Sequence, residues 1–274
     1  MSLMSDLNQL MVDHRFRPNQ KFSQNFIIDE NLIEKMVSEA KLKKTDVVLE
    51  IGSGAGSLTQ ELLKHCKVVG IELDEKMTEI LKSRFSKEKN FELVEGNILD
   101  VKLPKFNKIV ALPPYNISGD IMVRLFKEDF ELALLVFQRE FVEKLIAEPG
   151  FKEYSYLSVL TDQLFKPEIV IQNVSPRAFF PKPEAYSSLL KLKRKNSTFS
   201  IKNFPKFIAF LKNVFRYKNK NFSNALKNCL KSMKSDFKKV DPAQVCVELE
   251  LENLKTNLLE TEDFVNVFKK ISQE

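Results

Sequence analysis

The sequence predicts an α/β fold with a seven-stranded, mostly parallel sheet, followed by a small all-α C-terminal domain. Three observations predict this fold. Short apolar runs alternate with helical patterns through the first two-thirds of the 274 residues. Three of only seven glycines, Gly52, Gly54 and Gly56, follow the first apolar run directly. After residue 195 the apolar residues recur at helical spacing instead.

Seven segments are predicted as strands because they are short, apolar and rich in β-branched residues. The first five are continuous apolar runs, as is typical of parallel strands that are buried on both faces. The predicted strands are residues 47–51, 68–73, 91–94, 108–112, 132–137, 168–174 and 188–192. The helices predicted between them are residues 58–65, 75–85, 119–127 and 139–147.

The C-terminal third is predicted to be helical. Apolar residues recur at helical spacing from Phe204 to Leu230, and further helices are predicted over residues 242–249 and 261–271. The phenylalanines of this region are expected to form a core, because their period matches a buried face. With residues 194–200 as a polar linker, we predict an N-terminal extension over 1–17, an α/β domain over 18–195 and a helical domain over 196–274.

The composition excludes several protein classes. With 43% hydrophobic and 29% charged residues, a soluble globular protein is expected. The apolar runs are too short to cross a bilayer, and no apolar signal segment is visible, so we expect a cytoplasmic protein and no membrane partner. The cysteines (Cys66, Cys229 and Cys246) are widely spaced, which favours reduced core thiols. We predict no metal site.

Charge is distributed unevenly along the chain. Residues 191–240 carry 15 lysines and arginines against one acid, Asp236, whereas the net charge of the whole chain is +6. A basic segment on a nearly neutral body predicts a polyanionic partner such as nucleic acid. A solvated lysine-rich face is the alternative.

The glycine cluster predicts a nucleoside-binding loop. It follows the strand at 47–51 and precedes a helix, so the backbone can turn tightly and approach a ligand. Glu72 ends the next strand, twenty residues after Gly52, where an acid can bind a ribose diol. The spacing is G-x-G-x-G and Glu50 precedes it, which suits S-adenosylmethionine, a cofactor without phosphate, better than a dinucleotide. A dinucleotide oxidoreductase stays a distant alternative.

A rigid turn follows the fourth predicted strand. It reads Leu112, Pro113, Pro114 and Tyr115, at the sheet edge where open α/β sheets bind their substrates. The ring of Tyr115 is placed to stack on a planar base. A tyrosine packed behind a strand that proline terminates is the structural alternative.

Four further motifs resemble those of the ribosomal RNA adenine dimethyltransferases, a family of class I (Rossmann-like) methyltransferases. The loop at residues 50–56 is similar to their first cofactor motif. The other matches occur in family order: QKFSQNFIID at 20–29, QREFV at 138–142 with AEPG at 147–150 and LSV at 157–159, AFFPKP at 178–183, and FRYKNK at 215–220 with NAL at 224–226. The resemblance implies a seven-stranded methyltransferase domain over 18–195 and an RNA-binding helical domain over 196–274.

The resemblance also implies roles for individual residues. The cofactor would be bound by Gln24, Asn25, Ile27, Glu50, Gly52, Gly54, Glu72, Asn97 and Leu112. Asn97 stands where the family has aspartate, which puts affinity for adenine in doubt. Tyr115 and Phe179 would sandwich a flipped adenine, and Arg216, Lys218, Lys220 and Lys227 would contact rRNA phosphates.

One departure concerns catalysis itself. The family turn begins with Asn, and adenine N6-methyltransferases carry Asn, Asp or Ser there, whereas this chain has Leu112. Removing one such orienting group commonly costs about 10²- to 10³-fold in rate. The resemblance implies a cytoplasmic monomer that dimethylates N6 of two adjacent adenosines near the 3′ end of small-subunit rRNA. A non-catalytic rRNA-binding assembly factor and a large-subunit methyltransferase of the antibiotic-resistance type are the alternatives.

Overall fold

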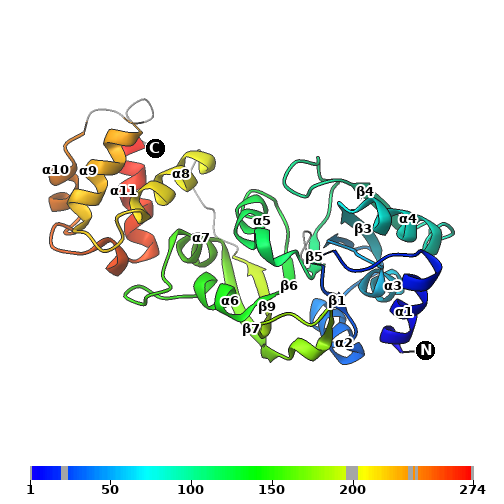
Figure 1. Ribbon diagram of the computed structural model, residues 1–274. Coiled ribbons are helices and arrows are strands. Elements are labelled where there is room, and N and C mark those ends of the chain that lie inside the picture. Colours follow the sequence, from blue (N-terminus) through cyan, green and yellow to red (C-terminus); the bar gives the residue numbers. More distant parts are fainter. Residues whose placement is uncertain (1, 20–23, 196–202, 234–236, 238–239, 273–274) are drawn as a thin grey trace. The chain divides into compact units, whose positions relative to one another are not determined.

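The computed structural model describes residues 2–19, 24–195, 203–233, 237 and 240–272. Figure 1 shows the course of the chain, which divides into two compact units. The first comprises Met1–Val142 and Pro167–Arg194, and the second comprises Glu143–Lys166 and Lys195–Glu274. Motif residues 20–23 and linker residues 196–200 lie outside the described part of the chain.

A seven-stranded sheet forms the centre of the first unit, with the order β4-β3-β2-β5-β6-β9-β7. All strand pairs from β4 to β6 are parallel, and β9 joins β6 antiparallel. Its strands are β2 (Val47–Ile51), β3 (Lys67–Glu72), β4 (Phe91–Glu95), β5 (Lys108–Ala111), β6 (Leu132–Gln138), β7 (Phe165–Val174) and β9 (Ser187–Arg194). This confirms the predicted seven-stranded, mostly parallel sheet.

The strand order places a binding crevice at one point of the sheet edge. From β2 the chain proceeds outward to β3 and β4, and then returns to β5 on the other side of β2. Open α/β sheets bind ligands at such a switch point, outside the carboxyl ends of the strands. The glycine loop after β2 and the proline turn after β5 therefore face the same crevice.

The first helix precedes all strands, and the other helices of the first unit lie between strands in the chain. Two of them, α2 and α3, pack beside each other and contact the sheet, and α4 contacts β3 and β4. The helices are α1 (Leu3–Asp13), α2 (Glu30–Ala40), α3 (Ser57–Leu63), α4 (Glu75–Arg84), α5 (Ser118–Leu125) and α6 (Arg139–Leu145), the last of which continues into the second unit. The four helices predicted here are confirmed, whereas α1 and α2 were not predicted.

A separate two-stranded sheet pairs β1 (Phe26–Ile27) antiparallel with β8 (Phe179–Phe180). In its register Phe26 lies opposite Phe180, and Ile27 lies opposite Phe179. Ile27 and Phe179 pack into the main core of the unit, together with residues of α2 and α3. The segment that carries Gln24 and Asn25 is thereby fixed beside the sheet.

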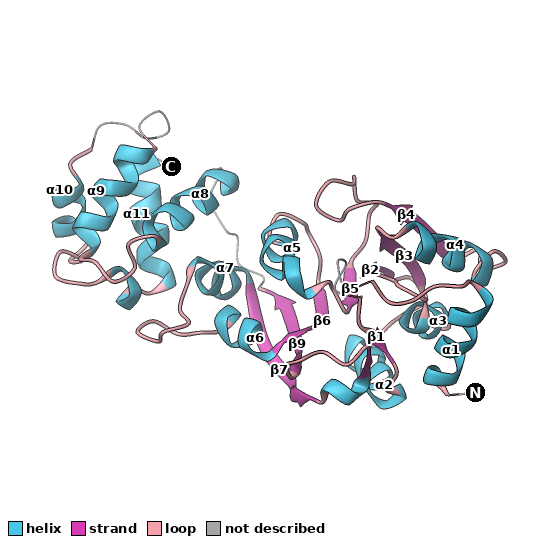
Figure 2. Cartoon of the chain, in the orientation of Figure 1, coloured by secondary structure: helices cyan, strands magenta, loops and turns pink. Residues whose placement is uncertain are grey.

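The regular structure in the described residues of the second unit is helical, apart from the first residues of β7 and one isolated β-bridge (Figure 2). The phenylalanines of its core are buried and contact one another, as predicted from their helical period, and examples are Phe207, Phe210 and Phe268. Its helices are α7 (Tyr156–Leu164), α8 (Phe204–Phe215), α9 (Phe222–Ser232), α10 (Pro242–Glu248) and α11 (Thr261–Ser272).

A segment from within the predicted α/β domain belongs to this helical unit. Residues Glu143–Lys166 pack with the C-terminal helices; for example, the Tyr154 hydroxyl donates a 2.9 Å hydrogen bond to the Leu259 carbonyl. The division into domains 1–17, 18–195 and 196–274 stays a prediction. Among the described helices, none is both long and apolar enough to cross a membrane.

Candidate cofactor and substrate site

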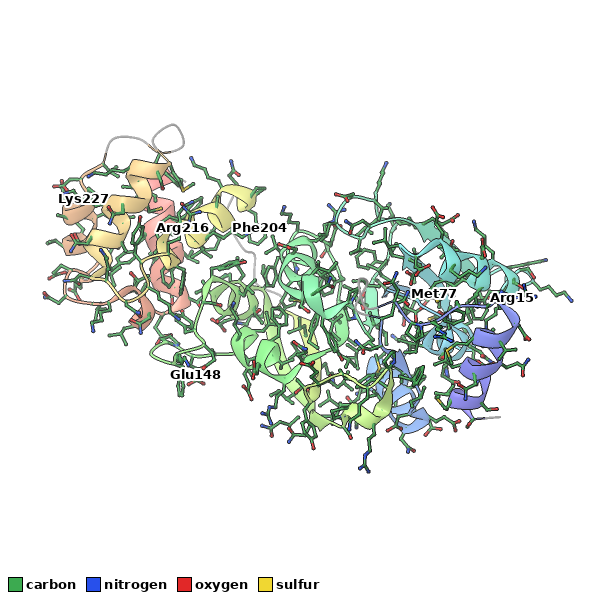
Figure 3. All side chains as sticks on the ribbon, in the orientation of Figure 1. Arg15, Met77, Glu148, Phe204, Arg216 and Lys227 are labelled. Atoms are coloured by element: carbon green, nitrogen blue, oxygen red, sulfur yellow. The ribbon has the colours of Figure 1, made fainter. Side chains whose placement is uncertain are left out.

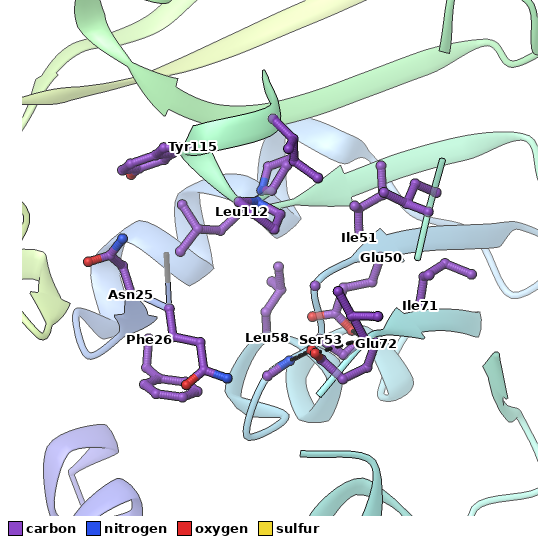
Figure 4. A pocket seen from close by; sticks show the side chains of 18 of the residues that line it. Asn25, Phe26, Glu50, Ile51, Ser53, Leu58, Ile71, Glu72, Leu112 and Tyr115 are labelled. Atoms are coloured by element: carbon purple, nitrogen blue, oxygen red, sulfur yellow. Dashed lines mark hydrogen bonds between the residues drawn. The ribbon is translucent and has the colours of Figure 1, made fainter. Parts of the chain in front are cut away.

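A pocket with a volume of about 260 Å³ opens at the switch point of the sheet. It is lined by residues that follow β2, β3, β4 and β5, together with the segment around β1. In Figure 4, Glu50, Ser53 and Glu72 lie together on one side, and Asn25 and Tyr115 lie on the other, with Leu112 between. The lining includes all nine predicted cofactor residues and the predicted turn Leu112, Pro113, Pro114 and Tyr115.

Glu50 lies at the end of β2 and is only 2% exposed. Its Oε2 accepts hydrogen bonds from the Ser53 hydroxyl (3.0 Å) and the Thr59 hydroxyl (2.6 Å). Burial, opposed by the two hydroxyls and aided by the negative charge of Glu72, raises the pKa of Glu50 to about 8. A cationic ligand in the pocket would favour the ionised form of this carboxyl group.

Glu72 ends β3 and holds the glycine loop in place. Its Oε2 accepts a 2.8 Å hydrogen bond from the Gly54 amide, and its Oε1 accepts bonds from the Leu73 and Asp74 amides, each at 2.9 Å. Burial raises the pKa of this carboxyl group, while the backbone donors oppose the shift. Carboxylate oxygens accept several hydrogen bonds each, so Glu72 retains capacity for a ligand hydroxyl.

The glycine loop turns through two residues with positive φ, of which Gly54 is also closely approached by a neighbouring side chain. Gly54 has φ of +55°, and a Cβ there would lie 3.1 Å from the ring of Phe26. Gly52 has φ of +74°, and a Cβ there would lie 3.5 Å from the Pro114 ring. Positive φ favours glycine at both positions. The loop thus contacts both the β1 segment and the proline turn.

Gln24 binds the N-terminal segment to α4. Its Nε2 donates a 2.8 Å hydrogen bond to Asp74, and its Oε1 accepts one from the Asn19 amide at 2.8 Å. The other oxygen of Asp74 caps the N-terminus of α4. Gln24 is therefore a wall residue of the pocket whose side-chain amide also makes structural hydrogen bonds.

Asn97 lies after β4 and forms a local turn. Its Oδ1 accepts a 3.0 Å hydrogen bond from the Leu99 amide. Its neighbours Gly96 and Ile98 line the same pocket. The amide oxygen of Asn97 has a second lone pair, so an exocyclic amine remains a suitable partner for it.

The proline turn carries an aromatic ring but no polar side chain at its first position. Leu112 is half-buried and packs against the core. The hydroxyl of Tyr115 forms a 2.7 Å hydrogen bond with the Ser187 hydroxyl, and burial raises the pKa of Tyr115 to about 12. Since Ser187 is fully buried at the start of β9, this bond fixes the orientation of the tyrosine ring.

Phe179 is not among the residues that line the pocket. It is 2% exposed and packs in the core, with its backbone paired to Ile27. Since adjacent residues of a strand point to opposite faces, Phe180 is oriented differently, and it packs against the cluster that contains Phe26. Phe179 serves as a core residue here, and its predicted place opposite Tyr115 in an adenine sandwich stays a prediction.

The four predicted RNA-binding residues all belong to the second unit. Figure 3 labels Arg216 after α8 and Lys227 on α9, and both side chains are exposed. Lys220 is exposed with its Nζ 5.8 Å from the centre of the Tyr217 ring. The Nζ of Lys218 donates a 2.8 Å hydrogen bond to the Lys152 carbonyl.

Sequence reasoning missed several side chains that complete the pocket. Ser53 and Thr59 bind Glu50, Asp74 binds Gln24, and Ser187 binds Tyr115. Thr59 lies nine residues after Glu50, on the helix that follows the glycine loop. This short separation in the sequence was a usable signal that the two side chains meet. Ser187 is 72 residues from Tyr115, and no local pattern connects the two.

The residues present fit S-adenosylmethionine. The described lining contains two buried acids, Glu50 and Glu72, and no lysine or arginine. This charge suits a cationic ligand and offers nothing to neutralise the pyrophosphate of a dinucleotide. Apolar side chains such as Ile71 and Leu99 supply walls for a planar base.

Comparison with known proteins gives a consistent set of relatives. The sequence matches the family described as "Ribosomal RNA adenine dimethylase" over residues 15–270. It is 36% identical over 266 residues to a probable ribosomal RNA small subunit methyltransferase A of Pyrococcus furiosus, which covers 93% of this chain and 94% of that protein. A protein of the same name from Methanococcoides burtonii is 41% identical over 204 residues, 74% of this chain and 75% of the other.

Solved structures agree with this comparison. A dimethyladenosine transferase from Plasmodium falciparum superposes with a TM-score of 0.80 at 28% identity, over 90% of this chain and 98% of that one. The 23S rRNA methyltransferase ErmE gives a TM-score of 0.66 at 24% identity, over 91% of this chain and all of the other. At that identity the second match shows the shared fold alone.

Proposed function

This chain belongs to the ribosomal RNA adenine dimethylase family, and from this premise we propose that it dimethylates N6 of two adjacent adenosines near the 3′ end of small-subunit rRNA. Family membership makes the protein an rRNA adenine methyltransferase that depends on S-adenosylmethionine. The small-subunit target is supported by the names of the relatives from P. furiosus and M. burtonii. One observation carries the proposal: an acidic pocket of the right composition lies directly beside an aromatic turn.

The pocket residues would divide the cofactor between them. S-adenosylmethionine supplies an electrophilic methyl group on a sulfonium. Glu50, with Gly52 and Gly54, would bind the cationic methionine end, and Glu72 would accept from the ribose hydroxyls. Asn97 would bind the adenine amine, while Gln24, Asn25, Ile27 and Leu112 would close the pocket around the methionine end.

The proline turn would position the acceptor adenine. Tyr115, held by Ser187, offers its ring to a base that has left its stack. The exocyclic amine of adenine is a weak nucleophile because its lone pair is conjugated with the ring. Acceptors for its N–H groups direct this lone pair toward the methyl group. Leu112 has no acceptor in its side chain, which leaves the Pro113 carbonyl for this task.

The remaining steps demand little of the protein. A methylated ammonium is acidic enough to lose its proton to water, so no general base is required. Exclusion of water and orientation of the amine are therefore the main contributions of Tyr115 and the two prolines. We propose that methyl transfer is slow because the side chain of Leu112 offers no acceptor to the adenine amine, so that Leu112 limits the rate.

The second unit would hold the RNA. Arg216, Lys218, Lys220 and Lys227 would contact phosphates, which positions the RNA without reading its sequence. We propose that the protein acts as a cytoplasmic monomer on the small subunit, with no membrane partner. The extension 1–17, the methyltransferase domain 18–195 and the RNA-binding domain 196–274 remain part of this proposal.

Leu112 favours one second function, that of an rRNA-binding assembly factor with little or no methyl transfer. To separate the two, the protein would be incubated with unmethylated ribosomal subunits and S-adenosylmethionine labelled on its methyl group. We expect labelled N6,N6-dimethyladenosine in small-subunit rRNA. Binding to small subunits without label would support the assembly factor instead. Label confined to large-subunit rRNA would overturn the proposed target.

A further inference from the structure

Three loops of the second unit join to form one surface, which we call the three-loop surface. It consists of residues 147–153, 216–221 and 255–258. The Gly150 amide donates to the Asn257 carbonyl at 2.7 Å, and the Asn257 amide donates to the Lys218 carbonyl at 2.9 Å. The Nζ of Lys218 then donates to the Lys152 carbonyl at 2.8 Å, so each loop is bound to the other two.

Exposed apolar side chains lie on this surface. The side chain of Phe151 is 61% exposed, and among the described phenylalanines it alone is exposed rather than buried or half-buried. Leu258 is 46% exposed, and a Cβ on Gly150 would lie 3.6 Å from its Cδ2. The first loop, which includes the labelled Glu148, can be followed in Figure 3. Phe151 and Leu258 are thus exposed on loops that hydrogen bonds fix to one another.

The same three loops are rich in basic side chains. The three loops carry five basic residues against two acids, Glu148 and Glu153. Lys152, Lys220 and Lys255 are all exposed. An isolated antiparallel bridge between Asn221 and Lys255 holds the second and third loops together. The three-loop surface therefore combines an exposed aromatic ring with exposed lysines on loops that hydrogen bonds hold together.

We propose that Phe151, with Leu258 exposed on a neighbouring loop, is a stacking platform for one unpaired nucleotide of the RNA substrate, with Lys152, Lys220 and Lys255 binding the adjoining phosphates. Unpaired bases stack on aromatic rings irrespective of their sequence, and lysines bind the phosphates between them. A protein partner fits less well, because excess positive charge around a small apolar pair matches a polyanion. The inference rests on the proposed function, since it takes rRNA as the substrate, but it concerns a different surface from the methyl-transfer pocket.

The test compares binding of F151A, F151W and the wild type to unmethylated small subunits and to a protein-free transcript of the 3′ region of small-subunit rRNA. V247A is the matched control, since Val247 is 60% exposed on α10 of the same unit. We expect F151A to bind both RNAs about 5- to 150-fold more weakly, F151W to bind like the wild type and V247A to show no loss. The slope of log affinity for RNA against log salt concentration should be unchanged in F151A. In K220A the magnitude of this slope should fall by about one.

The outcomes separate the inference from the proposed function. If wild-type protein binds and methylates small subunits but F151A binds as tightly as V247A does, the stacking platform is wrong and the proposed function stands. If F151A loses affinity for small subunits but not for the protein-free transcript, the surface contacts a ribosomal protein, and the inference is overturned. Unchanged cofactor binding by F151A shows that a loss of RNA affinity is not caused by misfolding.

Discussion

The two sides of the pocket differ in the polar side chains that they offer to a ligand. On the cofactor side, Glu50 and Glu72 are both buried, and together they accept five hydrogen bonds from hydroxyls and backbone amides. On the acceptor side, Tyr115 is held by Ser187, but the first position of the turn is the apolar Leu112. The cofactor site can thus keep its polar residues where the acceptor site has lost one. The two sites are nevertheless adjacent, since Gly52 of the glycine loop lies beside Pro114 of the proline turn.

The largest effect is expected from restoring a polar side chain at the turn. In L112N the amide oxygen gains a position from which it can accept the adenine N–H. We expect the rate of methyl transfer to rise about 10²- to 10³-fold with no more than a small change in cofactor affinity. The rate is measured as labelled dimethyladenosine formed in small-subunit rRNA. L112M is the control, because it changes shape without adding an oxygen or nitrogen, and an equal rise in L112M would refute this explanation.

Removing the carboxylate of Glu72, which holds the glycine loop, should weaken binding on the cofactor side of the pocket. E72A leaves the Gly54, Leu73 and Asp74 amides without their acceptor and removes the proposed ribose ligand. With about 1.5–3 kcal/mol for a hydrogen bond to a charged group, we expect cofactor binding to weaken by at least 100-fold. Isothermal titration with S-adenosylmethionine measures this. E92Q alters an exposed acid paired with Lys67 and should bind normally.

The raised pKa of Glu50 predicts how stability depends on pH. In the unfolded chain this carboxyl group ionises near its ordinary pKa of 4.5, whereas in the ligand-free fold its pKa is about 8. Between these values the unfolded state releases a proton that the folded state retains, so the contribution of Glu50 to the free energy of unfolding falls as pH rises.

E50Q should therefore be more stable than the wild type at pH 8, by on the order of 4 kcal/mol at most. This advantage should disappear toward pH 4. Denaturant unfolding of the ligand-free proteins across this range measures the difference. A difference that does not vary with pH would show that Glu50 is ionised in the fold.

The smallest effect is expected from removing the hydrogen bond that fixes the ring of Tyr115. S187A removes the partner of the Tyr115 hydroxyl, at a cost of about 1 kcal/mol. We expect transfer to slow about fivefold, with cofactor affinity unchanged. S188A is the matched control, because the hydroxyl of Ser188 is equally buried but donates to the Gln172 carbonyl. If S187A and Y115F each slow transfer and their combination slows it no further, the hydrogen bond accounts for the effect.

The cofactor side was predictable because its signals are local. The apolar strand, the glycines after it and Glu72 at the end of the next strand follow one another within 26 residues. Parallel strands bring such carboxyl ends to one edge without further information. The same reasoning located Leu112 and Tyr115 at the end of β5.

Other features depend on contacts that no local pattern specifies. The bond between Ser187 and Tyr115 requires β9 to return beside β6, which only the assembled sheet determines. Phe179 and Phe180 are adjacent and chemically identical, so only the register of β8 decides which of them is buried in the core. Likewise, Glu143–Lys166 packs with helices that begin only at Phe204, beyond the last strand of the sheet.

We infer that the cofactor site has the residues it needs to bind S-adenosylmethionine, whereas the acceptor turn limits the rate of methyl transfer. The most direct test is a single-turnover experiment, in which protein with bound labelled S-adenosylmethionine is mixed with excess unmethylated small subunits. Cofactor occupancy and transfer rate are then read from the same sample. We predict near-stoichiometric occupancy in both the wild type and L112N, with slow transfer in the wild type alone. Equal transfer rates in the two proteins, or a wild type that binds no cofactor, would contradict the account.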